Sequence, residues 1–187
     1  MDKKILPIIG LSTLAVSYLV KSSNQSVVRG ETNGTNENNV QELIIPGMLL
    51  DEFVSTRYQV SFKYPKDWVK NPRYADKYEG TTGFFEIGDF SGIGENIDQA
   101  VQQQINEAYQ PYGSNPTVRS FVVDGQPARV IYPSEDQSDF YNDREAAIVV
   151  QYRSPITING EPYKYVVIWT DKDHVSLILS TFKFIEE

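Results

Sequence analysis

Two short glycine-containing turns constrain the fold of this 187-residue chain more than any other feature. Each turn joins two apolar runs: Asp124-Gly125 lies between residues 118–123 and 128–132, and Asn159-Gly160 lies between residues 146–152 and 163–170. Asp-Gly and Asn-Gly accept the positive φ angles that two-residue hairpin turns require. The second pair of runs carries Val and Ile on both faces, which is typical of central strands covered on both sides. The sequence therefore predicts an antiparallel sheet that contains two hairpins.

Two further strands are expected on the N-terminal side of these hairpins. Apolar and polar residues alternate over residues 58–64, and the run at 83–90 reads GFFEIGDF. A period of two indicates a half-buried strand. The first of these strands is expected to end at the turn Pro65-Lys66-Asp67.

Two helices are expected, one in the middle of the chain and one near its end. Asn96 followed by Gln99 has the pattern of a capping box, and the apolar face behind it consists of Ile97, Ala100, Val101, Ile105 and Ala108. Asp171 is expected to cap the last helix, whose apolar face consists of Val175, Ile178, Leu179 and Phe182. A short strand-like piece at 182–185 follows. The predicted fold class is α+β, with a central antiparallel sheet.

The N-terminal segment has the character of a targeting sequence. Lys3 and Lys4 precede an uncharged apolar run at residues 5–20, which Lys21 closes. Such a run enters a bilayer with its positive end on the cytoplasmic side. Sixteen helical residues would span about 24 Å, whereas a hydrocarbon core is about 30 Å thick. Residues 1–22 are therefore predicted to be a signal peptide or a membrane anchor, and both alternatives stay open.

Residues 23–55 are predicted to be a flexible tether and a lead-in to one domain at residues 56–187. Ser22–Val40 is polar and rich in Asn, so it cannot bury enough apolar surface to offset its ordering entropy. The apolar island Glu42–Leu50 is expected either to dock on the domain or to contact a partner. Together with the targeting segment, this organisation predicts an extracytoplasmic protein that is membrane-anchored or secreted.

Charge and composition exclude several functional classes. The formal net charge of −8 disfavours nucleic acid and anionic lipid as partners, because both would be repelled. The sequence contains no Cys, which excludes thiol catalysis, disulfides and thiolate metal sites. An exported chain without disulfides fits the surface of a Gram-positive bacterium better than a eukaryotic secretory route.

Several segments resemble one known family. Residues 58–68 (YQVSFKYPKDW) and the end of the chain, Asp171–His174 with Ser180–Phe184, are similar to PsbP-like domains. The stretches at 111–116, 124–128 and 133–137 resemble the extra PsbP-like domain of some BlaR-type membrane metallopeptidases. The resemblance implies an α/β/α sandwich around an antiparallel sheet. It implies no protease activity, because this chain lacks an H-E-x-x-H motif and contains a single His.

Few residues suggest chemistry. His174 is interpreted as a partly exposed residue in the first turn of the last helix. Glu86 and Asp89 are three apart on one strand, so they should point to opposite faces and make a poor catalytic pair. The acidic loop 134–145 could bind Ca²⁺, with Asp139, Asn142 and Asp143 as the candidate ligands.

Aromatic residues are the most suggestive feature for function. Trp68, Tyr74, Tyr112 and Tyr141 are the candidate ligand-binding residues, because aromatic-rich loops suit contacts with proteins or glycans. The sequence therefore predicts a non-enzymatic binding or accessory module, monomeric and without a cofactor, whose partner is an envelope protein or a glycan. A hydrolase that uses carboxylates alone and a Ca²⁺-dependent surface module are the alternatives.

Overall fold

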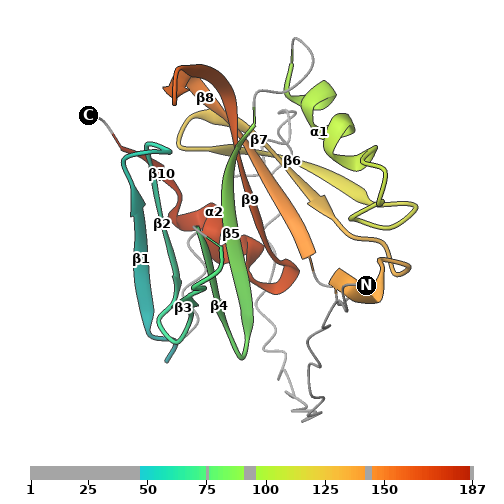
Figure 1. The fold of residues 1–187 in the computed structure, drawn as a ribbon, viewed down its shortest axis with the longest axis horizontal. Coiled ribbons are helices and arrows are strands. Elements are labelled where there is room, and N and C mark those ends of the chain that lie inside the picture. The colour runs from blue at the N-terminus through green and yellow to red at the C-terminus, as the bar shows by residue number, and fades with distance from the viewer. Residues whose placement is uncertain (1–46, 75, 91–95, 142–144, 186–187) are drawn as a thin grey trace, which may run out of the picture. The chain divides into compact units, whose positions relative to one another are not determined.

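The computed structural model describes residues 47–74, 76–90, 96–141 and 145–185 (Figure 1). A seven-stranded antiparallel sheet has the order β3-β4-β5-β9-β8-β7-β6, and a three-stranded sheet has the order β1-β2-β10. The strands are β1 Leu50–Ser55, β2 Val60–Pro65, β3 Val69–Lys70, β4 Lys77–Gly80, β5 Gly83–Phe90, β6 Thr117–Val123, β7 Gln126–Tyr132, β8 Glu145–Ile158, β9 Glu161–Asp171 and β10 Lys183–Phe184. The helices are α1 Ile97–Ile105 and α2 Val175–Thr181, with short 3₁₀ turns η1 Asp139–Tyr141 and η2 Lys172–His174.

Both predicted hairpins are confirmed. Asp124 and Gly125 have φ angles of 47° and 76°, and Asn159 and Gly160 have φ angles of 54° and 89°. Positive φ at both central residues defines the turn whose twist matches paired strands. The first turn joins β6 to β7 and the second joins β8 to β9. β8 and β9 lie at the centre of the sheet, as the apolar residues on both of their faces predict.

The two faces of the large sheet carry separate cores because side chains alternate along each strand. On β9, Val166 and Ile168 pack into the core that contains α2 and the small sheet. Tyr165 and Val167 point the other way, into the core beneath α1. The helices therefore lie on opposite faces of an antiparallel sheet, and the predicted α+β class is confirmed (Figure 1).

The cap of α1 follows the sequence signal, whereas Asp171 caps the 3₁₀ turn η2 instead of α2, whose N-cap His174 makes no side-chain cap. The Asn96 side chain accepts a hydrogen bond from the Gln99 amide, 3.0 Å away, and α1 begins at Ile97. Ala108 lies beyond the end of α1 and is exposed, so it does not belong to the buried helix face. Asp171 caps η2 through the amide of Asp173, and α2 follows directly. Phe182 packs into the core just after α2 ends.

The strands β1, β3 and β4 were not predicted from the sequence. β1 pairs with β2 along its whole length, so residues 50–55 belong to the folded part rather than to a lead-in that ends at residue 55. Only Phe53 of β1 is buried, because β1 is an edge strand whose charged residues face water. β3 and β4 are short and largely exposed, and their sequence carries little apolar alternation.

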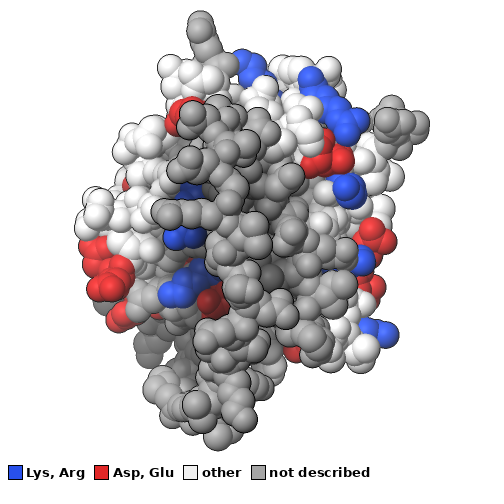
Figure 2. Space-filling view, turned by 180° about the vertical axis from the view of Figure 1, so that it is seen from behind, with Lys and Arg blue, Asp and Glu red and all other residues white. Residues whose placement is uncertain are grey.

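The targeting segment and most of the tether, residues 1–46, lie outside the described residues. Within the described ranges, no helix is both long enough and apolar enough to cross a bilayer. The side of the molecule opposite to the view of Figure 1 carries both acidic and basic side chains among its described residues (Figure 2). The acidic side chains visible there among the described residues do not form a single patch (Figure 2).

Candidate functional site

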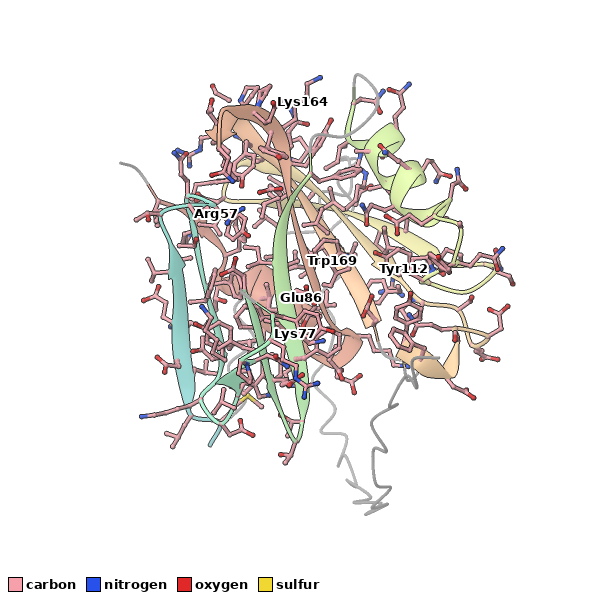
Figure 3. All side chains as sticks on the ribbon, viewed as in Figure 1. Arg57, Lys77, Glu86, Tyr112, Lys164 and Trp169 are labelled. Atoms are coloured by element: carbon pink, nitrogen blue, oxygen red, sulfur yellow. The ribbon has the colours of Figure 1, made fainter. Side chains whose placement is uncertain are left out.

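Helix α1 covers only part of its sheet face. It packs mainly on β7 and β8, where Ile97, Ala100 and Val101 meet Ile131 and Val149. A cross-strand row on the same face, formed by Lys77, Glu86 and Trp169, runs across β4, β5 and β9 (Figure 3). All three side chains are partly exposed. The row leaves a polar and aromatic strip next to the apolar core under α1.

The indole of Trp169 is held in a fixed position within this row. A Cβ on Gly88 of the neighbouring strand would lie 3.0 Å from the indole, so glycine makes room for the ring. The indole Nε1–H donates to the hydroxyl of Tyr112 over 3.1 Å, and that hydroxyl lies 3.5 Å from Oε1 of Gln104 on α1. Tyr112 and Gln104 are both buried, and burial is the main cause that raises the pKa of Tyr112. Trp169 therefore presents a half-buried ring that a buried hydrogen-bond chain orients.

Replacing Tyr112 by Phe tests this chain. The change leaves the indole Nε1–H without its acceptor and Gln104 without its donor, so we expect the free energy of unfolding to fall by about 1–2 kcal/mol. Urea unfolding of the full chain measures it. Tyr109→Phe is the matched control, because Tyr109 is highly exposed and its loss of a hydroxyl should cost less than about 0.5 kcal/mol. Equal costs for the two variants would contradict the assigned role of the Tyr112 hydroxyl.

Glu145, the first residue of β8, lies at the lower end of the same face. Its cross-strand partner Asp171 follows Trp169 by two residues, so Glu145 and Trp169 are diagonal neighbours. The side chain is half-buried, and within the described residues no hydrogen bond or ion pair holds its carboxylate. Burial raises the pKa of Glu145 to about 7; Lys77 opposes this rise, and the charges of Glu86 and Glu107 add to it.

Two exposed aromatic rings lie near Tyr141, which itself lies near this carboxyl group. Tyr109, in the loop after α1, is 85% exposed, and Phe140 of η1 is 82% exposed. The ring of Phe140 lies 5.1 Å from that of Tyr141 in an edge-on arrangement. Burial, then Glu145, Glu107 and Tyr109, raise the pKa of Tyr141, which places these groups close together. We call the set Tyr109, Phe140, Tyr141, Glu145 and Trp169 the aromatic–acid face.

Buried polar contacts fasten the two loops that carry these rings. The Gln137 side-chain amide donates to the carbonyl of Pro111 over 2.7 Å and to that of Glu145 over 2.9 Å. Gly113 has φ +80°, and a Cβ there would collide with the side chains of Ser134 and Asp136. The amide of Ser134 also donates to the carbonyl of Tyr112 over 3.0 Å. The loop that follows α1 and the loop before β8 therefore hold each other in place.

The four aromatic residues predicted from the sequence do not form one site. Tyr141 belongs to the aromatic–acid face, whereas Tyr112 is only 1% exposed and accepts the hydrogen bond of the Trp169 indole. Trp68 is only 2% exposed and belongs to the opposite core, where its Nε1–H donates to Thr82 Oγ1 over 2.9 Å. Tyr74 is 54% exposed and lines a separate hollow of about 700 Å³ with Arg57, Lys70 and Arg73. Trp169 was missed because it belongs to a strand segment that was interpreted as core. Glu145 was assigned to the acidic loop 134–145, and Tyr109 and Phe140 were not among the candidate residues.

The predicted calcium ligands are only partly within the structure. Asp139 begins η1, whereas Asn142 and Asp143 lie outside the described residues. No group of three His, Asp or Glu side chains that could hold a metal ion occurs in the described ranges. Asp136 of the same loop accepts from the Ser114 amide and the Ser134 hydroxyl. Hydrogen bonds from the Ser114 and Ser134 side chains, and then from the Ser114 amide, lower the pKa of Asp136 to about 2. Calcium binding stays a prediction.

The structure corrects the interpretation of His174. The residue is buried, with 7% exposure, rather than partly exposed, because η2 turns its ring into the core beside Trp68. The two ring centroids are 4.7 Å apart, and Nδ1 lies 3.8 Å from Asp171 Oδ1 without a hydrogen-bond partner. The ring of His174 is therefore part of the packed core and is not open to a substrate.

Glu86 and Asp89 point to opposite faces of β5, as their spacing predicts. Glu86 lies 3.9 Å from Lys77 on the α1 side. Asp89 lies 3.5 Å from Arg57. The two carboxylates are therefore separated by the sheet and do not form a catalytic pair.

Comparison with known proteins finds similarity among solved structures. No protein-family model matches the chain, and no curated protein compared with it matches either. The solution structure of cyanobacterial PsbP (CyanoP) from Synechocystis sp. PCC 6803 is similar, with a TM-score of 0.44 and 12% sequence identity. The similarity covers 72% of this chain and 92% of that protein.

Proposed function

We propose that residues 47–185 form a non-enzymatic binding module of a bacterial cell surface and that the aromatic–acid face is its binding surface. The observation that carries the proposal is the exposure of Tyr109 and Phe140, at 85% and 82%, near Tyr141 and the half-buried carboxyl group of Glu145. Large rings lose little conformational freedom on binding, which makes them efficient anchors for a partner. We further propose that the module is PsbP-like, from the resemblance of residues 58–68 and 171–184, and that residues 1–22 deliver it across the membrane.

The partner is an envelope protein in this proposal. The two loops that carry the rings are hydrogen-bonded to each other and form a preorganised surface. Binding of a partner therefore costs little conformational entropy for ordering these loops. The exposed rings lie beside polar groups instead of within a closed cavity, as in protein interfaces whose anchors are aromatic. A monomeric module of this kind acts by holding its partner at the membrane.

A specific test uses the full-length chain and envelope fractions of its source cell. The double variant Tyr109→Ser with Phe140→Ser is expected to lower the retained envelope protein at least about tenfold, since anchor residues contribute 2 kcal/mol or more each. Tyr74→Ser is the matched control, because Tyr74 is exposed on a different surface. Equal retention by the double variant and the parent chain, or an equal loss with Tyr74→Ser, would remove the proposed face.

A carboxylate-based hydrolase is the second candidate, and one observation favours it. A Glu whose pKa is raised to about 7 near other carboxylates is the pattern of a general acid. In that mechanism Glu145 would protonate a leaving group, and Glu86 or Glu107 would activate water. Hydrolysis of cell-wall glycan by the full chain, with loss of more than about 100-fold in Glu145→Gln, would establish this function in place of the binding module.

A further inference from the structure

Among the described residues that act on Glu145, carboxylates outnumber cations. Lys77 is the cation that the structure places near Glu145, but it already lies 3.9 Å from Glu86. Its Nζ also lies 5.4 Å from the centre of the Tyr74 ring and 5.0 Å from that of Phe84. Within the described residues, Glu107 and Glu145 have no ion-pair partner. Among the described residues, the face therefore combines aromatic surface with carboxylates that form no ion pair.

This combination discriminates between kinds of partner. An anionic group would be repelled by Glu86, Glu107 and Glu145. A neutral apolar or sugar surface would cover Glu145 and remove water from its carboxylate without supplying a countercharge, which is costly. A cation gains from the carboxylate and from the faces of the surrounding rings. A guanidinium group suits the site well, since it is planar, stacks on aromatic rings and donates to a carboxylate in pairs.

Resting on the function proposed above, we infer that the aromatic–acid face binds an arginine or lysine side chain of a partner polypeptide, with the cation beside Glu145. The occupant is fixed by charge complementarity and by the exposed rings of Tyr109 and Phe140. A second acceptor near the face also lacks a donor: Oε1 of buried Gln137 has no hydrogen-bond partner, while its amide nitrogen contacts the Glu145 carbonyl.

Binding of a cation at this position is coupled to pH. Glu145 has a pKa raised to about 7 in the free protein, chiefly by burial. The groups that face it are Lys77 of β4, Glu86 of β5, Glu107 after α1, and Tyr112 and Tyr141. Asp171 of β9, its cross-strand neighbour, turns to accept from the amide of Asp173. A bound cation favours the ionised carboxylate, so affinity should rise as pH increases through about 7 and level off above it.

The experiment uses calorimetric titration of the full-length chain with synthetic peptides. The probes are a capped Ser-Arg-Ser-Arg-Ser peptide, the same peptide with citrulline in place of Arg, and a chitosan oligomer of similar length as the non-peptide cation. We expect the Arg peptide to bind at least about tenfold more tightly than the citrulline peptide at pH 8, because citrulline keeps the shape and loses the charge. We expect the Arg peptide to bind about tenfold more weakly at pH 5.5 than at pH 8.

Glu145→Gln supplies the matched variant, and Glu161→Gln, an exposed Glu at the far β8–β9 turn, is its control. Glu145→Gln should remove both the preference for Arg over citrulline and the pH dependence, while Glu161→Gln should change neither.

Thermal unfolding of the ligand-free protein at several pH values tests the raised pKa of Glu145 independently. The folded state holds the Glu145 proton more tightly than the unfolded state, so its contribution to stability is lost as pH rises from about 4.5 to about 7. This loss should be absent in Glu145→Gln.

The outcomes separate the two proposals. Equal binding of the Arg and citrulline peptides, an unchanged pH profile in Glu145→Gln, or tighter binding of the chitosan oligomer would overturn the inference of a cationic polypeptide. In each case the binding module stands if Tyr109→Ser with Phe140→Ser still lowers retention of envelope protein. If that double variant has no effect, the proposed binding surface fails together with the inference.

Discussion

Replacing Phe85 by Ala should lower the free energy of unfolding by about 3–5 kcal/mol, which is the cost of removing a fully buried aromatic ring from a packed core. Phe85 has no exposed surface, and its ring centre lies between 4.9 and 6.3 Å from those of five other aromatic residues, Phe53, Phe62, Tyr64, Trp68 and Tyr78. The neighbours come from β1, β2, β4 and the β2–β3 turn, so the cavity would loosen the contact between the two sheets. Urea unfolding of the full chain measures the loss.

Val122→Ala is the control for this prediction. Val122 lies on β6, the outer strand of the large sheet, and is exposed, so truncation should change stability by less than about 0.5 kcal/mol. A cost for Phe85→Ala that does not exceed the cost for Val122→Ala would show that the aromatic cluster does not join the sheets.

Gly83→Val should cost about 3 kcal/mol through overpacking. A Cβ at this position would lie 2.9 Å from Cβ of Asp171, 3.1 Å from Nδ1 of His174 and 3.1 Å from Cζ2 of Trp68. These three residues are buried, so none can move into solvent, and the two further methyl groups of Val would enter the same space. The expected result is a lower urea midpoint with unchanged slope.

The matched control is Gly125→Asn, at a hairpin turn where no atom lies within 4 Å of an added Cβ. Asn tolerates positive φ, and we expect a cost of less than about 1 kcal/mol. If Gly83→Val unfolded at the same urea concentration as Gly125→Asn, the packing around His174 would be looser than the structure places it.

The elements that could be predicted well from the sequence are those specified by residues close together in the chain. Positive φ at Asp124-Gly125 and Asn159-Gly160, and the Asn96 cap, depend on residues next to each other, so they could be predicted without knowing the rest of the fold. β1 depends on a distant partner. Its sequence LDEFVS carries one buried residue, Phe53, and its pairing with β2 becomes apparent only when the sheet is assembled.

The candidate site was harder to predict because burial decides which aromatic residues can bind. Trp68 and Trp169 both lie near strands in the sequence, yet the first is enclosed and the second is half-buried. The difference arises from where α1 ends, which leaves part of one face uncovered, and from Gly88, which makes room for the indole. Tyr112 and Tyr141 were predicted from their loops, but only the structure brings them to Glu145.

The small sheet links the two ends of the folded part, and this affects how the chain can be made. β2 pairs with β1 on one side and with β10 on the other, so Ser61 faces Lys183 across more than 120 residues. The pairing of β10 with β2 is expected to form late in folding, because closing such a long loop costs entropy before the contact stabilises the sheet. In a nascent chain, the small sheet therefore cannot be completed until residues 183–184 have left the ribosome. Removing those few residues should leave an open edge on β2, the kind of edge to which another extended chain can add.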